Sequence, residues 1–328
     1  MIKLFLALML VCSNVFADFS LEPYKDRGFF YSAATTPAKA LVIFMHAVGG
    51  DGDLYNPTNG DYRHFKELTL HLNSQGVAVV GARGSVLVPK EVPVPVTGMR
   101  GWNANTEYGT ISSITCCSQI ITSIMNVPTV KYTPRPSQDD VGYMRDLIAD
   151  GAKALGIPTS KVVVAGISNG GIMAYRLQCS LPTSSVGAIV AVVGALTPPT
   201  LCNNSAAKYF AAINGSIDTT VPLNGGDTQL SMTPQYNFPL SAKESFNRVA
   251  AAAKCSTNCM TVDRVPAYPS FPKSPIIDVT KVYHNWTNYT PICPPDKEFH
   301  YVEFEQVGHG SPDMLSLGTL WAVSKVLQ

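Results

Sequence analysis

The sequence predicts an α/β fold built on a mostly parallel, doubly wound sheet, because apolar strand-like runs alternate with helical patterns. The apolar runs are unbroken, which suits strands buried on both faces of a parallel sheet. These runs are ALVIFMH (40–46), GVAVVGA (76–82), KVVVAG (161–166), GAIVAVVG (187–194) and KYFAAIN (208–214).

Helical patterns are clearest over residues 139–157 and 241–254. Apolar residues in the first recur at steps of three and four: Val141, Met144, Ile148, Ala152 and Leu155. Asp139 and Asp140 suit the N-terminus of this helix, and Gly156 with Pro158 is expected to end it. In the second, one stripe contains Phe246, Val249 and Ala253.

Length and composition allow one large α/β domain or two ordinary ones. The chain has 328 residues, of which 46% are hydrophobic, so it can fill a sizeable core. Only 14% are charged, and the formal net charge is +1. This balance argues against electrostatic binding of nucleic acid or an anionic membrane surface.

The N-terminus is typical of an export signal. One lysine in MIK precedes the short apolar run LFLALMLV, and VFA suits cleavage after Ala17. We therefore expect a signal peptide over 1–17, a single mature domain over 18–328, and a secreted or periplasmic protein. The apolar run is too short to span a bilayer, and no later run reaches the length that a bilayer requires. The alternatives are a buried first helix, or a lipoprotein attached at Cys12, which Val11 disfavours.

Two irregular stretches interrupt the alternation of strand and helix, over about 84–138 and 257–298. Long irregular segments in a compact domain are usually functional. We interpret both as insertions over one sheet, the first of which is expected to form a pocket wall.

Cysteine usage agrees with export, since disulfides persist in oxidising compartments. Removing Cys12 from the eight cysteines leaves seven, so at least one thiol is free or pairs between chains. Cys116 and Cys117 are adjacent and poorly placed to bridge each other. Zinc binding is disfavoured, because the chain has no C-x-x-C pair and its histidines are not at ligand spacing.

Ser168 lies in the pattern G-x-S-x-G, between the expected strand VVVAG and a helix that begins NGGIMAYRLQ. This strand–turn–helix context is the one that a serine nucleophile requires. Gly166, Gly170 and Gly171 would allow a close crossing of strand and helix. The helix N-terminus would then direct its free N–H groups at developing negative charge.

An acid and a histidine follow in the order that such a serine needs. Asp218 comes after the run YFAAING, and His309 comes after FHYVEFEQVG. Parallel strands deliver such residues to one edge of the sheet. Either residue alone would more often be an ordinary loop residue, but their order and context together predict a Ser168–Asp218–His309 triad.

Backbone groups are expected to form the oxyanion hole. One donor would be the N–H of Asn169, directly after the serine, and the second would come from Ala47 or Val48. His46 closes the preceding strand and is a candidate to orient this loop.

These motifs resemble the secreted polyhydroxybutyrate depolymerase-like esterases, which include feruloyl and acetyl xylan esterases. GISNGG resembles the family's GxSNGG, and GSIDTTVPLNGG its G(T/S)xDxxVPxxGG. DDVGYMRDLI, the cysteine pair at 116–117 and FMHA at 44–47 also have counterparts, and the resemblance covers about residues 40 to 312. The chain departs from the family at QVGHGSP, where GGGHTWP is usual, and at Ala47, where glycine is common.

The resemblance implies an α/β-hydrolase fold, a serine esterase mechanism, and disulfides Cys179–Cys202 and Cys255–Cys293. The expected substrates are feruloyl or acetyl esters of polysaccharide, or short polyhydroxyalkanoates, without a metal or organic cofactor. Trp102, Tyr108 and Trp286 could stack on an aromatic acyl group or a sugar, or could simply pack the irregular segments. The alternatives are a non-catalytic secreted binding protein on a hydrolase scaffold and a serine peptidase of the same fold.

Overall fold

The computed structural model describes residues 20–22, 27–48, 50–53, 62–89, 100–102, 132–134, 139–197, 200, 202–227, 237–267 and 279–328. The expected signal peptide, Tyr108, Cys116, Cys117 and most of the stretch 84–138 lie outside these residues.

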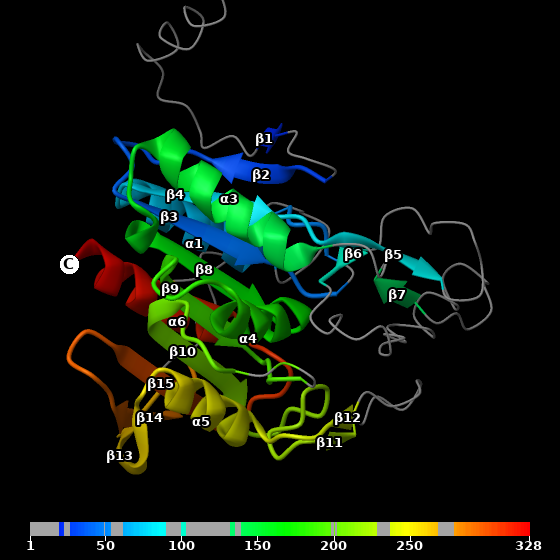
Figure 1. The fold of residues 1–328 in the computed structure, drawn as a ribbon, viewed down its shortest axis with the longest axis vertical. Coiled ribbons are helices and arrows are strands. Elements are labelled where there is room, and N and C mark those ends of the chain that lie inside the picture. Colours follow the sequence, from blue (N-terminus) through cyan, green and yellow to red (C-terminus); the bar gives the residue numbers. More distant parts are fainter. Residues whose placement is uncertain are drawn as a thin grey trace, which may run out of the picture.

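The described strands form a ten-stranded sheet in the order β1-β2-β4-β3-β8-β9-β10-β15-β14-β13 (Figure 1). Strands β4, β3, β8, β9, β10 and β15 are parallel, and antiparallel strands extend both edges. The bounds are β1 (Ser20–Glu22), β2 (Phe29–Ser32), β3 (Ala40–Met45), β4 (Val77–Ala82), β8 (Val162–Ile167), β9 (Val186–Val192), β10 (Ala207–Gly215), β13 (Ser256–Val265), β14 (Trp286–Ile292) and β15 (Glu298–Phe304).

Two small sheets lie beyond one end of the large sheet (Figure 1). One contains β5 (Ser85–Pro89), β6 (Arg100–Gly101) and β7 (Tyr132–Pro134). The other pairs β11 (Gly226–Asp227) with β12 (Asn237–Phe238).

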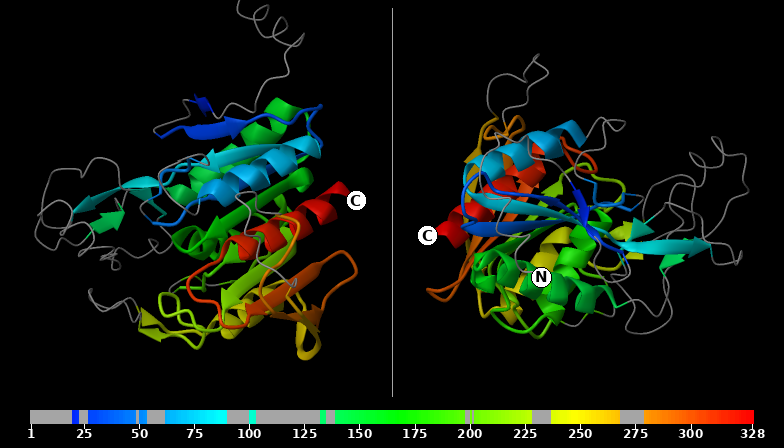
Figure 2. Two further views of the ribbon diagram at one scale, coloured as in Figure 1. Left: turned by 180° about the vertical axis from the view of Figure 1, so that it is seen from behind. Right: turned by 90° about the horizontal axis from the view of Figure 1, so that it is seen from above.

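Helices cover both faces of the large sheet, as a doubly wound fold requires (Figure 2). Helices α1 (Tyr62–Ser74) and α6 (Pro312–Leu327) lie on one face. Helices α3 (Asp140–Leu155), α4 (Asn169–Ser180) and α5 (Ala242–Ala252) lie on the other, and a 3₁₀ turn over Thr159–Lys161 leads into β8. This arrangement confirms the predicted fold class. Within the described ranges, no helix combines the length and apolar character needed to cross a bilayer.

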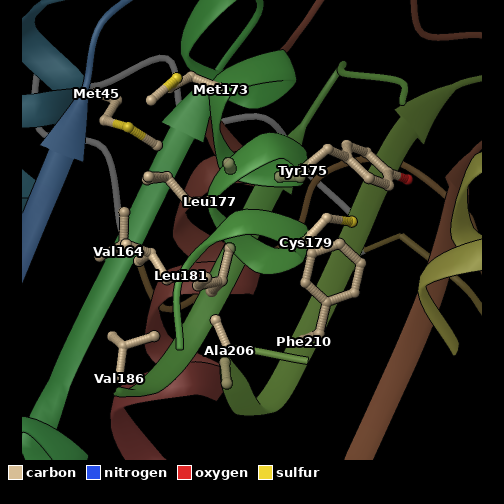
Figure 3. Close-up of a cluster of buried hydrophobic side chains, with 14 of the residues drawn as sticks. Met45, Val164, Met173, Tyr175, Leu177, Cys179, Leu181, Val186, Ala206 and Phe210 are labelled. Atoms are coloured by element: carbon tan, nitrogen blue, oxygen red, sulfur yellow. The ribbon is translucent and has the colours of Figure 1, made fainter. Parts of the chain in front are cut away.

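The core consists of two apolar layers, one on each face of the sheet. Figure 3 shows part of the layer beneath α4, where Met173 and Leu177 of the helix lie near Met45 of β3 and Val164 of β8. On the same helix, Tyr175 packs edge-on against Phe210 of β10. The central strands are buried on both faces, which explains their unbroken apolar sequences.

Helix α3 begins and ends close to the residues that its sequence indicates. The Asp139 carboxylate accepts a hydrogen bond of 2.7 Å from the backbone N–H of Gly142, which caps the helix. At the other end, Gly156 adopts a left-handed conformation with φ of 67°. Asp140 does not face solvent. It is 1% exposed and forms an ion pair with Arg27, and it also accepts a hydrogen bond of 2.7 Å from the Ser85 hydroxyl.

Replacing Asp140 by Asn is expected to lower the free energy of unfolding by about 3–5 kcal/mol, because it removes the carboxylate that faces the buried Arg27 guanidinium. Urea unfolding measures this change. Glu244→Gln is the matched control, since Glu244 pairs with Arg248 on an exposed helix face, where such a pair contributes less than about 1 kcal/mol. Equal unfolding midpoints for the two variants would contradict the prediction.

The stretch 257–298 differs from its interpretation as an irregular insertion. Most of β13 and all of β14 fall within it, and both strands are antiparallel additions to the edge of the large sheet. The sequence of β13 is largely polar, and most of its residues are exposed. Both strands lack the apolar runs by which the central strands are recognised.

Two disulfides join Cys179 to Cys202 and Cys255 to Cys293, the pairs that the family resemblance implies. The first links α4 to the segment before β10. The second links the residues after α5 to those after β14. Cys259 on β13 is exposed and is a free thiol among the described cysteines.

Candidate active site

The register of the parallel strands brings the predicted site residues to one edge of the sheet. Ile167 of β8 lies beside Val192 of β9, which lies beside Ile213 of β10, which in turn lies beside Val302 of β15. Ser168 follows directly after β8, while the loops after β10 and β15 carry Asp218 and His309. Residues distant in sequence thus meet because their strands end together.

Ser168 adopts a sharp turn with φ of 57° and ψ of −119°, a conformation that non-glycine residues rarely adopt. Two hydrogen bonds of 2.9 Å hold this turn. The backbone N–H of Ser168 donates to the Val192 carbonyl, and its carbonyl accepts from the N–H of Ile172 in α4. The strain is thereby imposed by β9 and α4 together.

The glycines around Ser168 are sterically required. A Cβ at Gly166 would lie 2.1 Å from the Gly170 carbonyl oxygen, and one at Gly171 would lie 2.3 Å from the Val192 carbonyl oxygen. Strand β8 and helix α4 therefore cross at a distance that only glycine allows, as the sequence pattern predicts.

The Ser168 hydroxyl is directed to His309. Although Ser168 occupies the N-cap position of α4, within the described part of the chain its hydroxyl caps no N–H of that helix. His309 Nε2 lies 2.8 Å from Ser168 Oγ. A serine at an N-cap position often accepts a hydrogen bond from the helix through its hydroxyl. Because Ser168 makes no such bond, its oxygen is available to an incoming group.

Asp218 orients the opposite side of the His309 ring. His309 Nδ1 lies 2.9 Å and 3.1 Å from the two carboxylate oxygens of Asp218, whose side chain is completely buried. Backbone N–H groups of Thr220 and Val221 donate to the same carboxylate at 2.8 Å and 3.0 Å. This arrangement favours the tautomer with the proton on Nδ1, so that Nε2 can accept the proton of Ser168.

The loops that carry Asp218 and His309 are packed closely together. A Cβ at Gly215 would lie 2.3 Å from the Val307 carbonyl oxygen, and the N–H of Ile217 donates to that same oxygen at 3.1 Å. A glycine at the end of β10 is thus what lets the two loops meet.

A buried carboxylate anchors the far side of the His309 loop. Asp313 is 2% exposed and accepts hydrogen bonds from the Ser311 hydroxyl, from the N–H of Tyr283 at 2.8 Å, and from His284 Nδ1 at 2.9 Å. Sequence analysis missed this residue, because its partners Tyr283 and His284 lie about thirty positions upstream and no local pattern marks them.

His46 supports the loop that would supply the second oxyanion donor. Its Nδ1 lies 2.6 Å from the Ala47 carbonyl, and its Nε2 accepts a hydrogen bond of 2.9 Å from the N–H of Gly84. Burial lowers the pKa of His46 to about 4, so the ring is neutral at pH 7 and can serve as donor and acceptor at once. The expectation that His46 orients this loop agrees with these contacts.

Because the folded pKa of His46 lies below the ordinary value near 6.5, the unfolded chain binds this proton more readily. His46 is therefore expected to make stability fall as pH drops from about 6.5 towards 4, by up to about 3 kcal/mol. Urea unfolding at pH 7.0, 5.5 and 4.5 measures this effect as the difference between wild type and His46→Gln. The variant should be less stable at pH 7 but show a flatter dependence, and parallel curves would contradict the assignment.

The three aromatic residues considered as substrate contacts lie in different places. Trp102 is fully buried, so of its two alternatives packing fits the structure and stacking on substrate does not. Trp286 packs on Phe304 and lines a hollow with His300 and Trp321, separate from the one beside His309. Tyr108 lies outside the described residues.

A small apolar hollow of about 80 Å³ adjoins His309. It lies between the His309 loop, the end of β8 and helices α1 and α6, and its lining residues are Phe65, Ile167, His309, Gly310, Ser311, Pro312 and Leu315. The described residues contain no group of three or more His, Cys, Asp or Glu side chains placed to hold a metal ion.

The sheet order, its two helical layers and the serine on the turn after β8 define an α/β-hydrolase fold. Residues 137–244 match the family model described as phospholipase/carboxylesterase. The matched residues include Ser168 and Asp218 and end before His309. A search of curated proteins finds no match.

Several solved structures are similar to this chain at low sequence identity. An acetyl xylan esterase from Aspergillus awamori is 14% identical with a TM-score of 0.53, over 94% of this chain and 97% of that one. TT1662 from Thermus thermophilus is 12% identical with a TM-score of 0.49, over 96% and 99%. LpqC, a poly(3-hydroxybutyrate) depolymerase from Bordetella parapertussis, is 13% identical with a TM-score of 0.46, over 93% and 90%.

Proposed function

We propose that this protein is a secreted serine esterase that hydrolyses carboxylic esters through Ser168, His309 and Asp218. The observation that carries this proposal is the unbroken chain of hydrogen bonds from the buried Asp218 carboxylate through His309 to the Ser168 hydroxyl. The match to a phospholipase/carboxylesterase family model over 137–244 supports ester substrates.

In the first half of the reaction, His309 Nε2 takes the proton of Ser168 as Oγ attacks the ester carbonyl carbon. The carbonyl oxygen becomes negatively charged and receives hydrogen bonds from the N–H of Asn169 and from an N–H at Ala47 or Val48. Asp218 stabilises the imidazolium that forms. His309 then protonates the leaving alcohol, and an acyl group remains on Ser168.

In the second half, a water molecule takes the place of the alcohol. His309 accepts its proton, hydroxide attacks the acyl carbon, and the carboxylic acid leaves as Ser168 regains its proton. The N-terminus of α4 is oriented to favour negative charge near Asn169 in both halves. None of these steps needs a group other than the chain's own residues and water.

The proposed substrates are acetyl or feruloyl esters of polysaccharide, followed by short hydroxyalkanoate oligomers. Motif resemblance around Ser168 and Asp218 supports this choice, and the Aspergillus awamori structure of the same fold is an acetyl xylan esterase. The small apolar hollow beside His309 favours a compact apolar group over a charged one.

Export forms part of the proposal. The sequence of residues 1–17 is typical of a signal peptide. The disulfides Cys179–Cys202 and Cys255–Cys293 are of the kind that persist in oxidising compartments. Mass determination of protein recovered from the periplasm or medium, with cleavage after Ala17 as the expected result, tests this part.

The activity is tested by intact-mass labelling of the mature protein with a fluorophosphonate, with Ser168→Ala as the control. A single adduct on wild type and none on the variant is the expected result. A panel of methyl ferulate, acetylated xylan and hydroxybutyrate oligomers then ranks the substrates. A folded wild-type sample that takes no label would overturn the esterase proposal in favour of a non-catalytic binding protein.

A further inference from the structure

Trp102 is fully buried beside the candidate site and joins two segments that the mechanism needs. It follows β6 and lies next to Asn169, the first residue of α4. The Trp102 backbone N–H donates to the Asn169 side-chain oxygen at 2.5 Å, and the Asn169 side-chain nitrogen donates to the Trp102 carbonyl at 3.2 Å. The two residues thus exchange a reciprocal pair of hydrogen bonds.

The indole of Trp102 makes the second connection. Its Nε1–H donates to the His46 carbonyl at 3.0 Å, and its ring lies 5.3 Å from the His46 imidazole, centroid to centroid. His46 directly precedes Ala47. Trp102 is therefore bonded to the segment that carries each of the two proposed oxyanion donors.

These two segments also approach each other directly. A Cβ at Gly170 would lie 2.3 Å from the Met45 carbonyl oxygen and 2.8 Å from that of His46, so their backbones are already in contact. Contact limits the distance between the segments but leaves them free to slide or rotate. The hydrogen bonds of Trp102 have direction, so they restrict those motions as well.

Burial stabilises the hydrogen bonds among Trp102, Asn169 and His46 against alternative pairings. Asn169 is 7% exposed and His46 is 8% exposed, so a polar group that lost its partner here would have little access to water. Asparagine suits position 169 because its side chain offers both a donor and an acceptor. Oxyanion donors act only if they are held in place before charge develops, and small displacements reduce the rate strongly.

We propose that Trp102 is a positioning residue of the oxyanion hole, and that its bonds to Asn169 and His46 fix the separation and orientation of the two donor segments. This inference rests on the proposed esterase function. It assigns Trp102 no contact with substrate, and it explains why a large aromatic residue is completely buried at the edge of the site.

The test uses Trp102→Phe, which keeps a buried aromatic ring but removes the Nε1–H bond to His46. Asn169→Ala is the second variant, because it removes both side-chain bonds and keeps the backbone N–H of residue 169. Trp321→Phe is the matched control, since Trp321 Nε1 donates to Glu298 at the base of β15 and is not part of the site. Each variant is assayed with p-nitrophenyl acetate and by hydrogen exchange of peptides covering 43–50 and 166–172.

For Trp102→Phe and Asn169→Ala we expect kcat to fall by about ten- to a hundredfold with KM changed less than about twofold. Exchange should become faster in both peptides. The double variant should lose little more than either single variant, because the two residues act as one unit. Trp321→Phe should leave kcat and both peptides unchanged.

Two results would overturn the positioning role. One is exchange in both peptides that matches wild type, and the other is faster exchange with an unchanged kcat. An inactive wild type would instead refute the proposed esterase function. Hydrogen exchange would then still decide whether Trp102 holds the two segments, since that measurement needs no turnover.

Discussion

Replacing Ser168 by Ala is expected to lower kcat for p-nitrophenyl acetate by about 10⁴-fold or more and to leave the fold unchanged. The Ser168 hydroxyl oxygen is the proposed nucleophile, and His309 Nε2 lies 2.8 Å from it. The turn itself depends on backbone bonds to Val192 and Ile172, which alanine keeps. Steady-state kinetics and thermal unfolding of the two proteins measure both parts.

Ser311→Ala is the matched control for this experiment. Ser311 also lies beside His309, but its hydroxyl donates to the Asp313 carboxylate and takes no part in the proposed steps. It should retain activity within about tenfold of wild type, since it only supports the loop. Turnover by Ser168→Ala at the wild-type rate would show that another residue is the nucleophile.

Gly170→Ala is expected to destabilise the protein by more than about 4 kcal/mol, or to prevent it from folding. The added methyl group would lie 2.3 Å from the Met45 carbonyl oxygen, where neither a strand backbone nor a helix backbone can move independently. Relief would require α4 to shift away from β3, and this movement would open the core packing that Figure 3 shows.

Gly308→Ala is the matched control, because a Cβ at Gly308 meets nothing within 4 Å. Its effect on stability should be under about 1 kcal/mol and could be favourable, since alanine restricts the unfolded chain. Urea unfolding of both variants makes the comparison. A Gly170→Ala variant as stable as wild type would mean that α4 does not approach β3 this closely.

The central fold was predictable because its signals are local. A buried parallel strand needs an apolar run, so the runs at 40–46 and 161–166 lie close to Ala40–Met45 and Val162–Ile167. The turn at Ser168 was predictable because the glycines that it requires lie within three residues of it.

Other features depend on contacts that the sequence does not display. The sequence placed Asp140 at a helix N-terminus but did not show its burial, which depends on an ion pair with Arg27, 113 positions earlier. Trp102 lies in an irregular stretch, so its sequence left open whether it contacts substrate or packs inside the protein. Its partners His46 and Asn169 are 56 and 67 positions away, and only the folded chain brings them together.

The edge strands could not be predicted from sequence for a different reason. Strand β13 is largely polar because it has one strand neighbour and faces water over most of its length. Its pairing with β14 also shifts register between Ser256 and Thr261. Such a strand forms because of its pairing with neighbouring strands more than because of its own residues. The periodicity of its apolar residues therefore does not identify it.

The parallel register of β8, β9, β10 and β15 makes the site sensitive to chain length as well as to side chains. Each strand residue advances the chain by about 3.3 Å and reverses the side of the sheet that its side chain faces. Deleting a single residue inside β10 would thus withdraw Asp218 from His309 by more than the length of their hydrogen bond. It would also move the side chains beyond the deletion from one core layer to the other. Insertions and deletions within these strands should therefore disrupt both the site and the core.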